Sequence, residues 1–173
     1  MLNPKVQDAL NAQINMEFSA YYTYLSMAAY FEAESLTGFA AWVHHHAQEE
    51  MMHAMKIYDY VNDRRGRVKL QALSGPKVEW ASALEAFEDA LKHEQKVTAS
   101  INKIVDLAIQ ESDHATRSFL NWFVDEQVEE ELIVDAVIQD LKRIGDFGPG
   151  IYMLDRELAT KQSDEEAEEG EEA

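Results

Sequence analysis

Glu50 and His53 lie three residues apart, and a carboxylate and an imidazole are side chains that ligate metal ions and transfer protons. On a helix, both side chains project from the same face. Steps of three and four along that face give a stripe that is apolar at its ends and polar in its middle: Phe39, Val43, His46, Glu50, His53, Ile57 and Tyr60. A carboxylate and an imidazole in such a core cost several kcal/mol each unless they are paired, protonated or bound to a metal.

Three other segments carry an apolar stripe that is interrupted in the same way. The interruption is Glu17 in the first segment, Glu94 in the third, and the pair Gln127 and Glu130 in the fourth. Each lies near the middle of its stripe. We therefore expect the polar positions to meet at one level if the four segments pack side by side as antiparallel helices.

The positions of glycine, proline and capping residues delimit these segments. We predict helices from about 4 to 33, from an N-cap at Thr37 to about 64, from a capping box at 82–85 to a turn at 112–113, and from there to Gly145. Residues 67–80, which include Gly75 and Pro76, read as a long crossover loop. A short fifth helix is predicted over 151–159.

The order of these elements predicts an all-α four-helix bundle with one long crossover and a short fifth C-terminal helix. The spacing from Glu17 to Glu50 is 33 residues, as is the spacing from Glu94 to Gln127. The chain therefore reads as two helical hairpins related by a quasi-repeat and joined by the crossover.

Length, charge and cysteine content narrow the function classes. The 173 residues contain no cysteine, which excludes disulfides and thiolate metal sites, and their formal charge is −18. Such a charge argues against nucleic-acid binding, and no apolar window is long enough to span a membrane. We expect a soluble cytoplasmic protein with one domain over 1–160 and an acidic, disordered tail over 161–173, which carries a net charge of −6.

The inward-facing polar set is rich in carboxylates and has no lysine or arginine on its stripes to neutralise them: Glu17, Glu50, His53, Glu94, Gln127 and Glu130. Several carboxyls are therefore protonated, or cations are bound. Four carboxylates suit two divalent ions that share a bridging glutamate. Oxygen-rich ligands with one imidazole and no sulfur favour Fe(II) or Mn(II) over structural zinc.

A pair of redox-active ions can deliver two electrons to dioxygen or peroxide. Tyr24 lies two turns from Glu17 on the same face, so its hydroxyl is placed to hydrogen-bond a ligand or donate an electron. Trp122 lies beside the cluster in sequence, although packing explains it better. In the run at 44–46, successive helical side chains point about 100° apart and cannot chelate one ion, so we expect His44 and His45 at the surface.

Together with Tyr24, these carboxylates, the Glu50-x-x-His53 pair and the Gln127-x-x-Glu130 pair resemble the ferroxidase centre of non-haem bacterial ferritins, over about residues 1–160. Ferritin-like proteins are themselves a standard example of bundles with one crossover and a di-iron site. Their usual second Glu-x-x-His motif is replaced here by Gln127 and Glu130, which points away from the haem-bearing members. We expect no haem.

The resemblance implies a twenty-four-subunit shell that oxidises Fe(II) with O2 or H2O2 and stores ferric mineral. The implied ligands of two irons are Glu17, Glu50, His53, Glu94 and Glu130, with Gln127 a hydrogen-bonding or weak ligand. It also implies a third iron site at Glu49, Glu126 and Glu129, with Glu130 shared. Without the resemblance, those three acids read as a solvated face.

Two alternatives remain at this point. The first is a stand-alone di-iron or di-manganese enzyme, such as a peroxidase, which does not store metal. The second is a non-catalytic shell whose buried carboxyls are neutral. The predicted helix over 151–159 favours a shell, because it has no evident role in a free enzyme.

Overall fold

The computed structural model describes the backbone of residues 2–172 and the side chains of residues 2–160. Its elements are five helices: α1 (Pro4–Ala33), α2 (Thr37–Asp63), α3 (Ala83–Gln110), α4 (His114–Ile144) and α5 (Gly148–Glu172). No strand occurs in the described part of the chain. The first four helices begin and end within a few residues of the predicted bounds.

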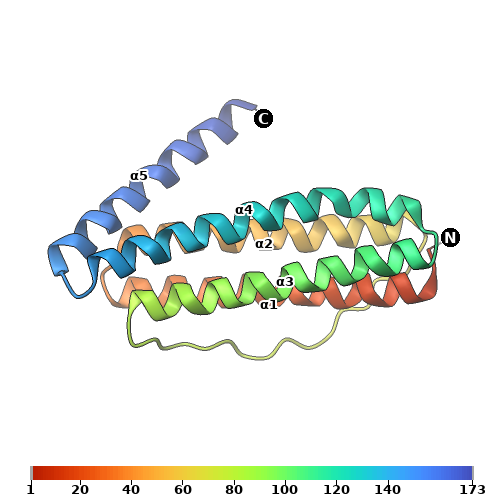
Figure 1. The fold of residues 1–173 in the computed structure, drawn as a ribbon, viewed down its shortest axis with the longest axis horizontal. Coiled ribbons are helices and arrows are strands. Elements are labelled where there is room, and N and C mark those ends of the chain that lie inside the picture. Colours follow the sequence, from red (N-terminus) through yellow and green to blue (C-terminus); the bar gives the residue numbers. More distant parts are fainter. Residues whose placement is uncertain (1, 173) are drawn as a thin grey trace.

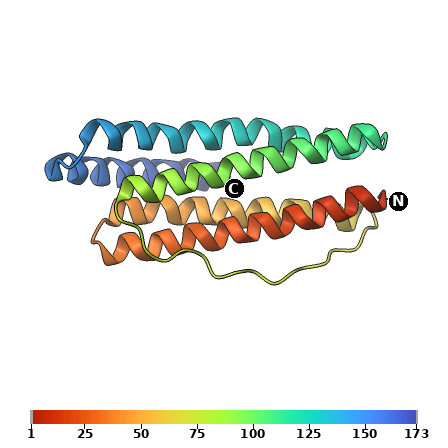
Figure 2. The same cartoon turned by 60° about the horizontal axis from the view of Figure 1, so that its bottom comes forward.

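The first four helices lie side by side along one long axis (Figure 1). α1 packs against α2 and α3 packs against α4, so the two predicted hairpins are present, and α1 also contacts α3. The segment between α2 and α3 runs the length of the bundle in both views (Figures 1 and 2). None of the described helices is both long and apolar enough to cross a bilayer.

Side-chain caps fix where three of the helices begin. The Asn3 side chain accepts a hydrogen bond from the backbone N–H of Lys5, Ser82 from that of Glu85, and Asp113 from that of Thr116. Each cap satisfies one of the donors that a first helical turn leaves unpaired.

The prediction of Thr37 as an N-cap is wrong. Leu36 occupies the cap position of α2 and makes no side-chain hydrogen bond. Asp155 of α5 caps α2 instead. Its Oδ1 accepts hydrogen bonds from the backbone N–H of Gly38 at 2.7 Å and from that of Phe39 at 3.0 Å. A Cβ at Gly38 would lie 1.7 Å from the Asp155 carbonyl oxygen, so only glycine permits this close approach.

The fifth helix is longer than predicted, because it begins at Gly148 and extends to Glu172. Pro149 falls in its first turn, where a missing N–H costs nothing. Its buried side chains Leu154, Asp155 and Leu158 pack it against α2 and α4. The side chains of the predicted tail at 161–173 lie outside the described residues, so its disorder stays a prediction.

Replacing Asp155 by alanine should loosen α5 from the bundle. Two buried N–H groups would lose their acceptor, which costs about 1–3 kcal/mol of unfolding free energy. Thermal unfolding followed by circular dichroism would measure the change. Asp155→Asn keeps an oxygen at the same place and should lose less. Equal melting temperatures for wild type and Asp155→Ala would contradict this role.

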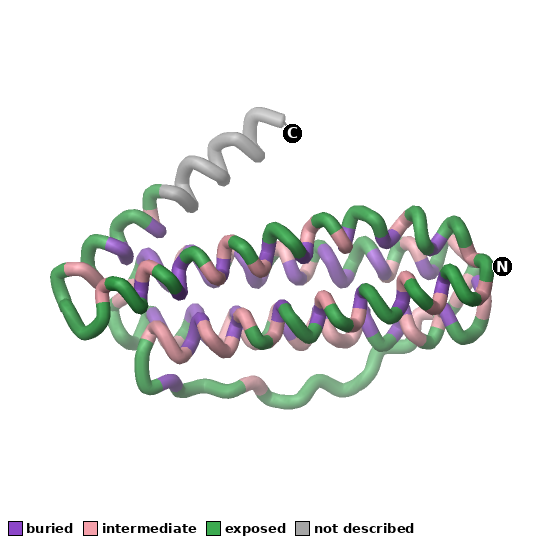
Figure 3. The backbone as a smooth tube through the Cα atoms, in the orientation of Figure 1, coloured by how far each residue is buried: buried purple, intermediate pink, exposed green. Residues whose placement is uncertain are grey.

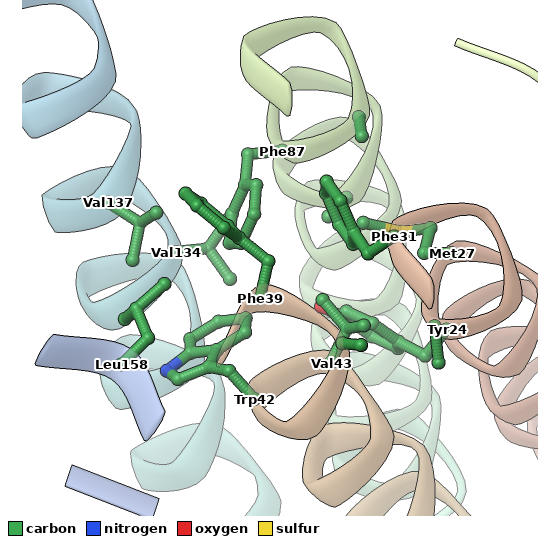
Figure 4. Close-up of a cluster of buried hydrophobic side chains, with 14 of the residues drawn as sticks. Tyr24, Met27, Phe31, Phe39, Trp42, Val43, Phe87, Val134, Val137 and Leu158 are labelled. Carbon is green, nitrogen blue, oxygen red and sulfur yellow. The ribbon is translucent and has the colours of Figure 1, made fainter. Parts of the chain in front are cut away.

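The core consists of two apolar clusters separated along the bundle. One cluster lies toward α5 and includes Phe31, Phe39, Trp42 and Phe87 (Figure 4). The other lies toward the N-terminus and is built from aliphatic side chains and Phe123. Buried residues line the inner faces of all four long helices (Figure 3). The predicted polar positions occupy the middle of these helices, between the two clusters.

Candidate metal centre

The structure brings the predicted polar residues together in the bundle core. Each has at most 4% of its surface exposed: Glu17, Glu50, His53, Glu94, Gln127 and Glu130. All four long helices contribute, because the buried face of each one carries its polar residues near mid-length. This placement agrees with the convergence that the sequence predicts.

One potential metal group consists of Glu17, Glu50 and His53, all buried. One ligand atom of each lies within 4.8 Å of the others. Gln13, one turn before Glu17, donates its amide N–H to Glu17 Oε1 at 2.8 Å. The carboxylate of α1 is therefore held in place by its own helix, while its second oxygen is buried without a hydrogen-bond partner among the described residues.

A second potential group joins α2 to α4 and shares His53 with the first. It consists of His53, Glu126 and Glu130. His53 Nδ1 lies 3.6 Å from Glu50 Oε2, and His53 Nε2 lies 3.8 Å from Glu126 Oε1. The imidazole therefore stands between the two groups, and Glu50 and Glu126 lie on opposite edges of the ring.

Glu94 belongs to neither group, and two neutral side chains hydrogen-bond its carboxylate. Tyr24 donates its hydroxyl to Glu94 Oε1 at 2.6 Å, and Gln127 Nε2 donates to Glu94 Oε2 at 3.3 Å. Gln127 also donates to the Thr98 hydroxyl at 3.3 Å, and that hydroxyl donates to Glu131 Oε1 at 2.6 Å. Glu94 is thus oriented from two sides by neutral donors.

The residues of the implied third site lie in different environments. Glu126 is half-buried beside His53, as described above. Glu49 is also half-buried, with its carboxylate 3.6 Å from His45 Nε2 and 3.7 Å from His46 Nδ1. Glu129 is exposed on α4. Of these three acids, the structure groups only Glu126 with Glu130 as potential ligands of one ion.

Burial raises the pKa of every carboxyl in the layer. Desolvation raises the pKa of Glu17 to about 7, against the hydrogen bond from Gln13, which lowers it. Desolvation, followed by the charges of neighbouring carboxylates, raises the pKa of Glu130 to about 9 and that of Glu50 well above its usual value. The pKa of Glu94 is also raised, chiefly by burial. Carboxyls in this state need a cation to ionise together.

Burial has the opposite effect on the two core histidines. It lowers the pKa of His46 to about 3 and that of His53 to about 4. Both rings are therefore neutral at pH 7, and their contacts of 3.6 Å or more with glutamates are not ion pairs. A neutral imidazole has the lone pair that a metal ion requires.

The donor set fits divalent iron. Within the described residues, one carboxyl oxygen each of Glu17, Glu50 and Glu130 is buried without a hydrogen-bond partner. None of the four glutamates in the layer forms an ion pair with a lysine or arginine in that part of the chain. Several carboxylate oxygens and one imidazole suit Fe(II). The unsatisfied atoms mark where the ions would bind.

The metal-free protein should become less stable as pH rises from 6.5 to 9. A buried carboxyl with a raised pKa stabilises the fold fully below its unfolded pKa, and loses this contribution as pH rises through 7 for Glu17 and 9 for Glu130. The lowered pKa values of His46 and His53 make stability rise with pH, but only below pH 6.5. Calorimetry at several pH values would measure the slope. Glu130→Gln should flatten it, because most of the contribution of Glu17 is already lost by pH 7, and stability that rises with pH throughout this window would contradict the assignment.

Sequence reasoning missed several residues around the centre. Gln13 carried a detectable signal, because it lies four residues before Glu17 on an otherwise apolar face. The stacking of His46 on Trp42, with ring centroids 3.7 Å apart, carried the same kind of signal, because the two residues lie four apart on α2. Trp122, for which the sequence favoured packing, does pack edge-to-face on His53, with centroids 5.4 Å apart, whereas the Lys56 ammonium 3.4 Å above the Trp122 ring centroid was missed.

Comparison with known proteins places the chain in a family. A family model described as "Ferritin-like domain" matches residues 7–144. The chain belongs to the ferritin family. The predicted resemblance and fold class are therefore confirmed, and the chain is a subunit of an iron-storage protein.

Full-length relatives agree with this assignment. The bacterial non-heme ferritin of Staphylococcus aureus is 45% identical over 166 residues, which cover 96% of this ferritin and 100% of the relative. That of Staphylococcus saprophyticus is 47% identical and covers 95% and 99% of the two chains. An open-pore ferritin from the archaeon Archaeoglobus fulgidus superposes with a TM-score of 0.91 at 46% identity, over 92% of this chain and 98% of that one.

Proposed function

We propose that this subunit binds two Fe(II) ions in the polar layer and oxidises them as a pair. The proposed ligands are Glu17, Glu50, His53, Glu94 and Glu130. Gln127 hydrogen-bonds Glu94 from α4 and remains a weak-ligand candidate through its amide oxygen. The observation that carries the proposal is the set of buried carboxyl oxygens that have no hydrogen-bond partner in the described structure.

The chemistry balances as a two-electron oxidation. Each Fe(II) gives up one electron, and one O2 accepts both electrons with two protons and leaves as H2O2. With H2O2 as oxidant, the same two electrons and two protons give two molecules of water. Carboxyls with raised pKa values, such as Glu17 and Glu130, lose their protons when iron binds. The ferroxidase activity therefore begins with proton release.

A third iron beside the pair is supported most strongly at Glu126 and Glu130. Their oxygens lie within 4.8 Å of each other and of a His53 nitrogen. We propose Glu49 and Glu129 as further carboxylates that an iron at this position attracts. The exposure of Glu129 suits an ion that exchanges with the mineral store.

The family assignment supports a proposal on assembly and location. We propose a homo-oligomeric shell of twenty-four subunits with a cytoplasmic location, and a domain that ends near residue 160 before the acidic tail. The relatives' description as non-heme ferritins supports our expectation that the protein binds no haem. Neither nucleic acid nor a membrane has a place in this function.

Anaerobic Fe(II) titration followed by aerobic stopped-flow absorbance tests the proposal on a sample of known assembly size. We expect saturation near two Fe(II) per subunit, with a third weaker equivalent, and rapid ferric absorbance on mixing with air. Titration without a defined stoichiometry, or oxidation no faster than in buffer, would refute a paired iron site.

A further inference from the structure

A lysine lies at the edge of the second potential metal group. The Lys56 ammonium is 3.4 Å from the centroid of the Trp122 ring, and Trp122 packs edge-to-face on His53. His53 belongs to that group together with Glu126 and Glu130. Ammonium groups are attracted to the face of an indole ring, so Trp122 holds the charge of Lys56 beside the group.

The register of α2 and α4 places this charge one helical turn from the group. His53 Nε2 lies 3.8 Å from Glu126 Oε1. Lys56, three residues further along α2, contacts Trp122, which lies four residues before Glu126 on α4. A helical turn rises about 5.4 Å, so the ammonium lies about that far along the bundle from an ion bound between His53 and Glu126.

The charge of Lys56 already acts on both of these ligands. Burial lowers the pKa of His53, and the charge of Lys56 lowers it further. Burial and the charge of Glu129 raise the pKa of Glu126, and Lys56 opposes them by favouring the carboxylate. A positive charge that favours the carboxylate at Glu126 repels a metal cation bound to that carboxylate.

The Lys56 side chain is not fixed by a carboxylate. It is exposed, and in the part of the chain that the structure describes it forms no ion pair. Its four-carbon stem is flexible, and its contact with Trp122 is at the surface, where cation–π attraction is weak. The ammonium is therefore held loosely and gives way to an incoming cation.

We propose that Lys56 competes with the third iron. Its ammonium weakens the binding of Fe(II) at His53, Glu126 and Glu130, so that an ion is held there only in transit. The iron pair is affected less, because Glu50 lies nearly two turns from Lys56 on α2. The inference rests on the third iron of the proposed function and adds the residue that sets its affinity.

A charge series at position 56 tests this role in the assembled, metal-free protein. Anaerobic titration calorimetry with Fe(II) gives the affinity of the third equivalent. Lys56→Gln should raise this affinity about fivefold, as expected for a single and a double charge one turn apart at a wet surface, and Lys56→Glu should raise it further. Lys56→Arg keeps the charge and should stay near wild type. Lys103→Gln, at an exposed position on α3, is the matched control and should change nothing.

Ionic strength separates an effect of charge from an effect of shape. Raising NaCl from about 0.05 M to about 0.5 M shortens the range of exposed charges. We therefore expect the third-equivalent affinities of wild type and Lys56→Gln to converge at high salt. A difference that persists unchanged would show that the size of the side chain is responsible, and would overturn the inference.

The outcomes separate this inference from the function on which it rests. Two tight equivalents with the same weak third equivalent in wild type and Lys56→Gln overturn the role of Lys56 alone. Absence of a third equivalent from every variant also overturns it. Failure of the wild type to bind paired Fe(II) overturns the ferroxidase proposal, and the charge series still decides whether Lys56 opposes a cation at His53 and Glu126.

Discussion

Glu50→Ala should abolish rapid iron oxidation. Glu50 lies in the first potential metal group with Glu17 and His53, and its carboxyl also interacts with that of Glu94. Removing it takes away the proposed ligand that interacts with both Glu17 and Glu94. Loss of a partner that only orients a ligand costs about 10- to 100-fold in metal affinity or activity, so we expect a fall of more than about 100-fold in the initial rate. Stopped-flow absorbance would measure it.

Glu50→Gln separates loss of a ligand from loss of the fold. The amide keeps the size of the side chain but not its charge, and should oxidise iron as poorly as the alanine variant. Because burial raises the pKa of Glu50 and makes its ionisation unfavourable, the metal-free Gln variant should be more stable than wild type at pH 8. Glu88→Gln on the outside of α3 serves as a control. Wild-type oxidation in Glu50→Gln would contradict the site.

Tyr24→Phe should slow oxidation without changing how many Fe(II) ions bind. The Tyr24 hydroxyl donates to Glu94 Oε1 at 2.6 Å in a fully buried position. A hydrogen bond to a charged group contributes about 1.5–3 kcal/mol, so its loss corresponds to a rate lower by about tenfold or more. Stopped-flow absorbance gives the rate, and anaerobic titration gives the stoichiometry.

The neighbouring Tyr22 provides the matched control. It is 44% exposed, so Tyr22→Phe removes the same atom from the surface of the same helix. We expect wild-type kinetics from this variant. Equal rates for Tyr24→Phe and wild type would show that neither the hydrogen bond nor electron donation by Tyr24 contributes to the reaction.

Local sequence signals were sufficient for the bundle and its polar layer. A glutamate in a long apolar stripe, such as Glu17 or Glu94, is conspicuous because helical period alone decides which face is buried. Two hairpins joined by one crossover then place the polar positions of the four stripes at one level in the bundle. The caps at Asn3 and Ser82 were readable for the same reason, since each acts within a few residues.

Features that depend on distant partners were not predictable. Asp155 caps α2 across 117 residues of sequence. The residues around Thr37 therefore do not reveal that a distant side chain takes the capping role. The helix predicted over 151–159 begins at Gly148 instead, because a first turn tolerates Pro149 and Gly150. The hydrogen bonds of Glu94 likewise depend on the positions of α1 and α4 along the bundle axis relative to α3.

Anomalous diffraction at the iron edge, from crystals loaded anaerobically with Fe(II), would test the paired iron site most directly. We expect two strong peaks per subunit within bonding distance of Glu17, Glu50, His53, Glu94 and Glu130, with both bordering Glu50. Peaks confined to surface carboxylates, with the polar layer empty, would contradict it.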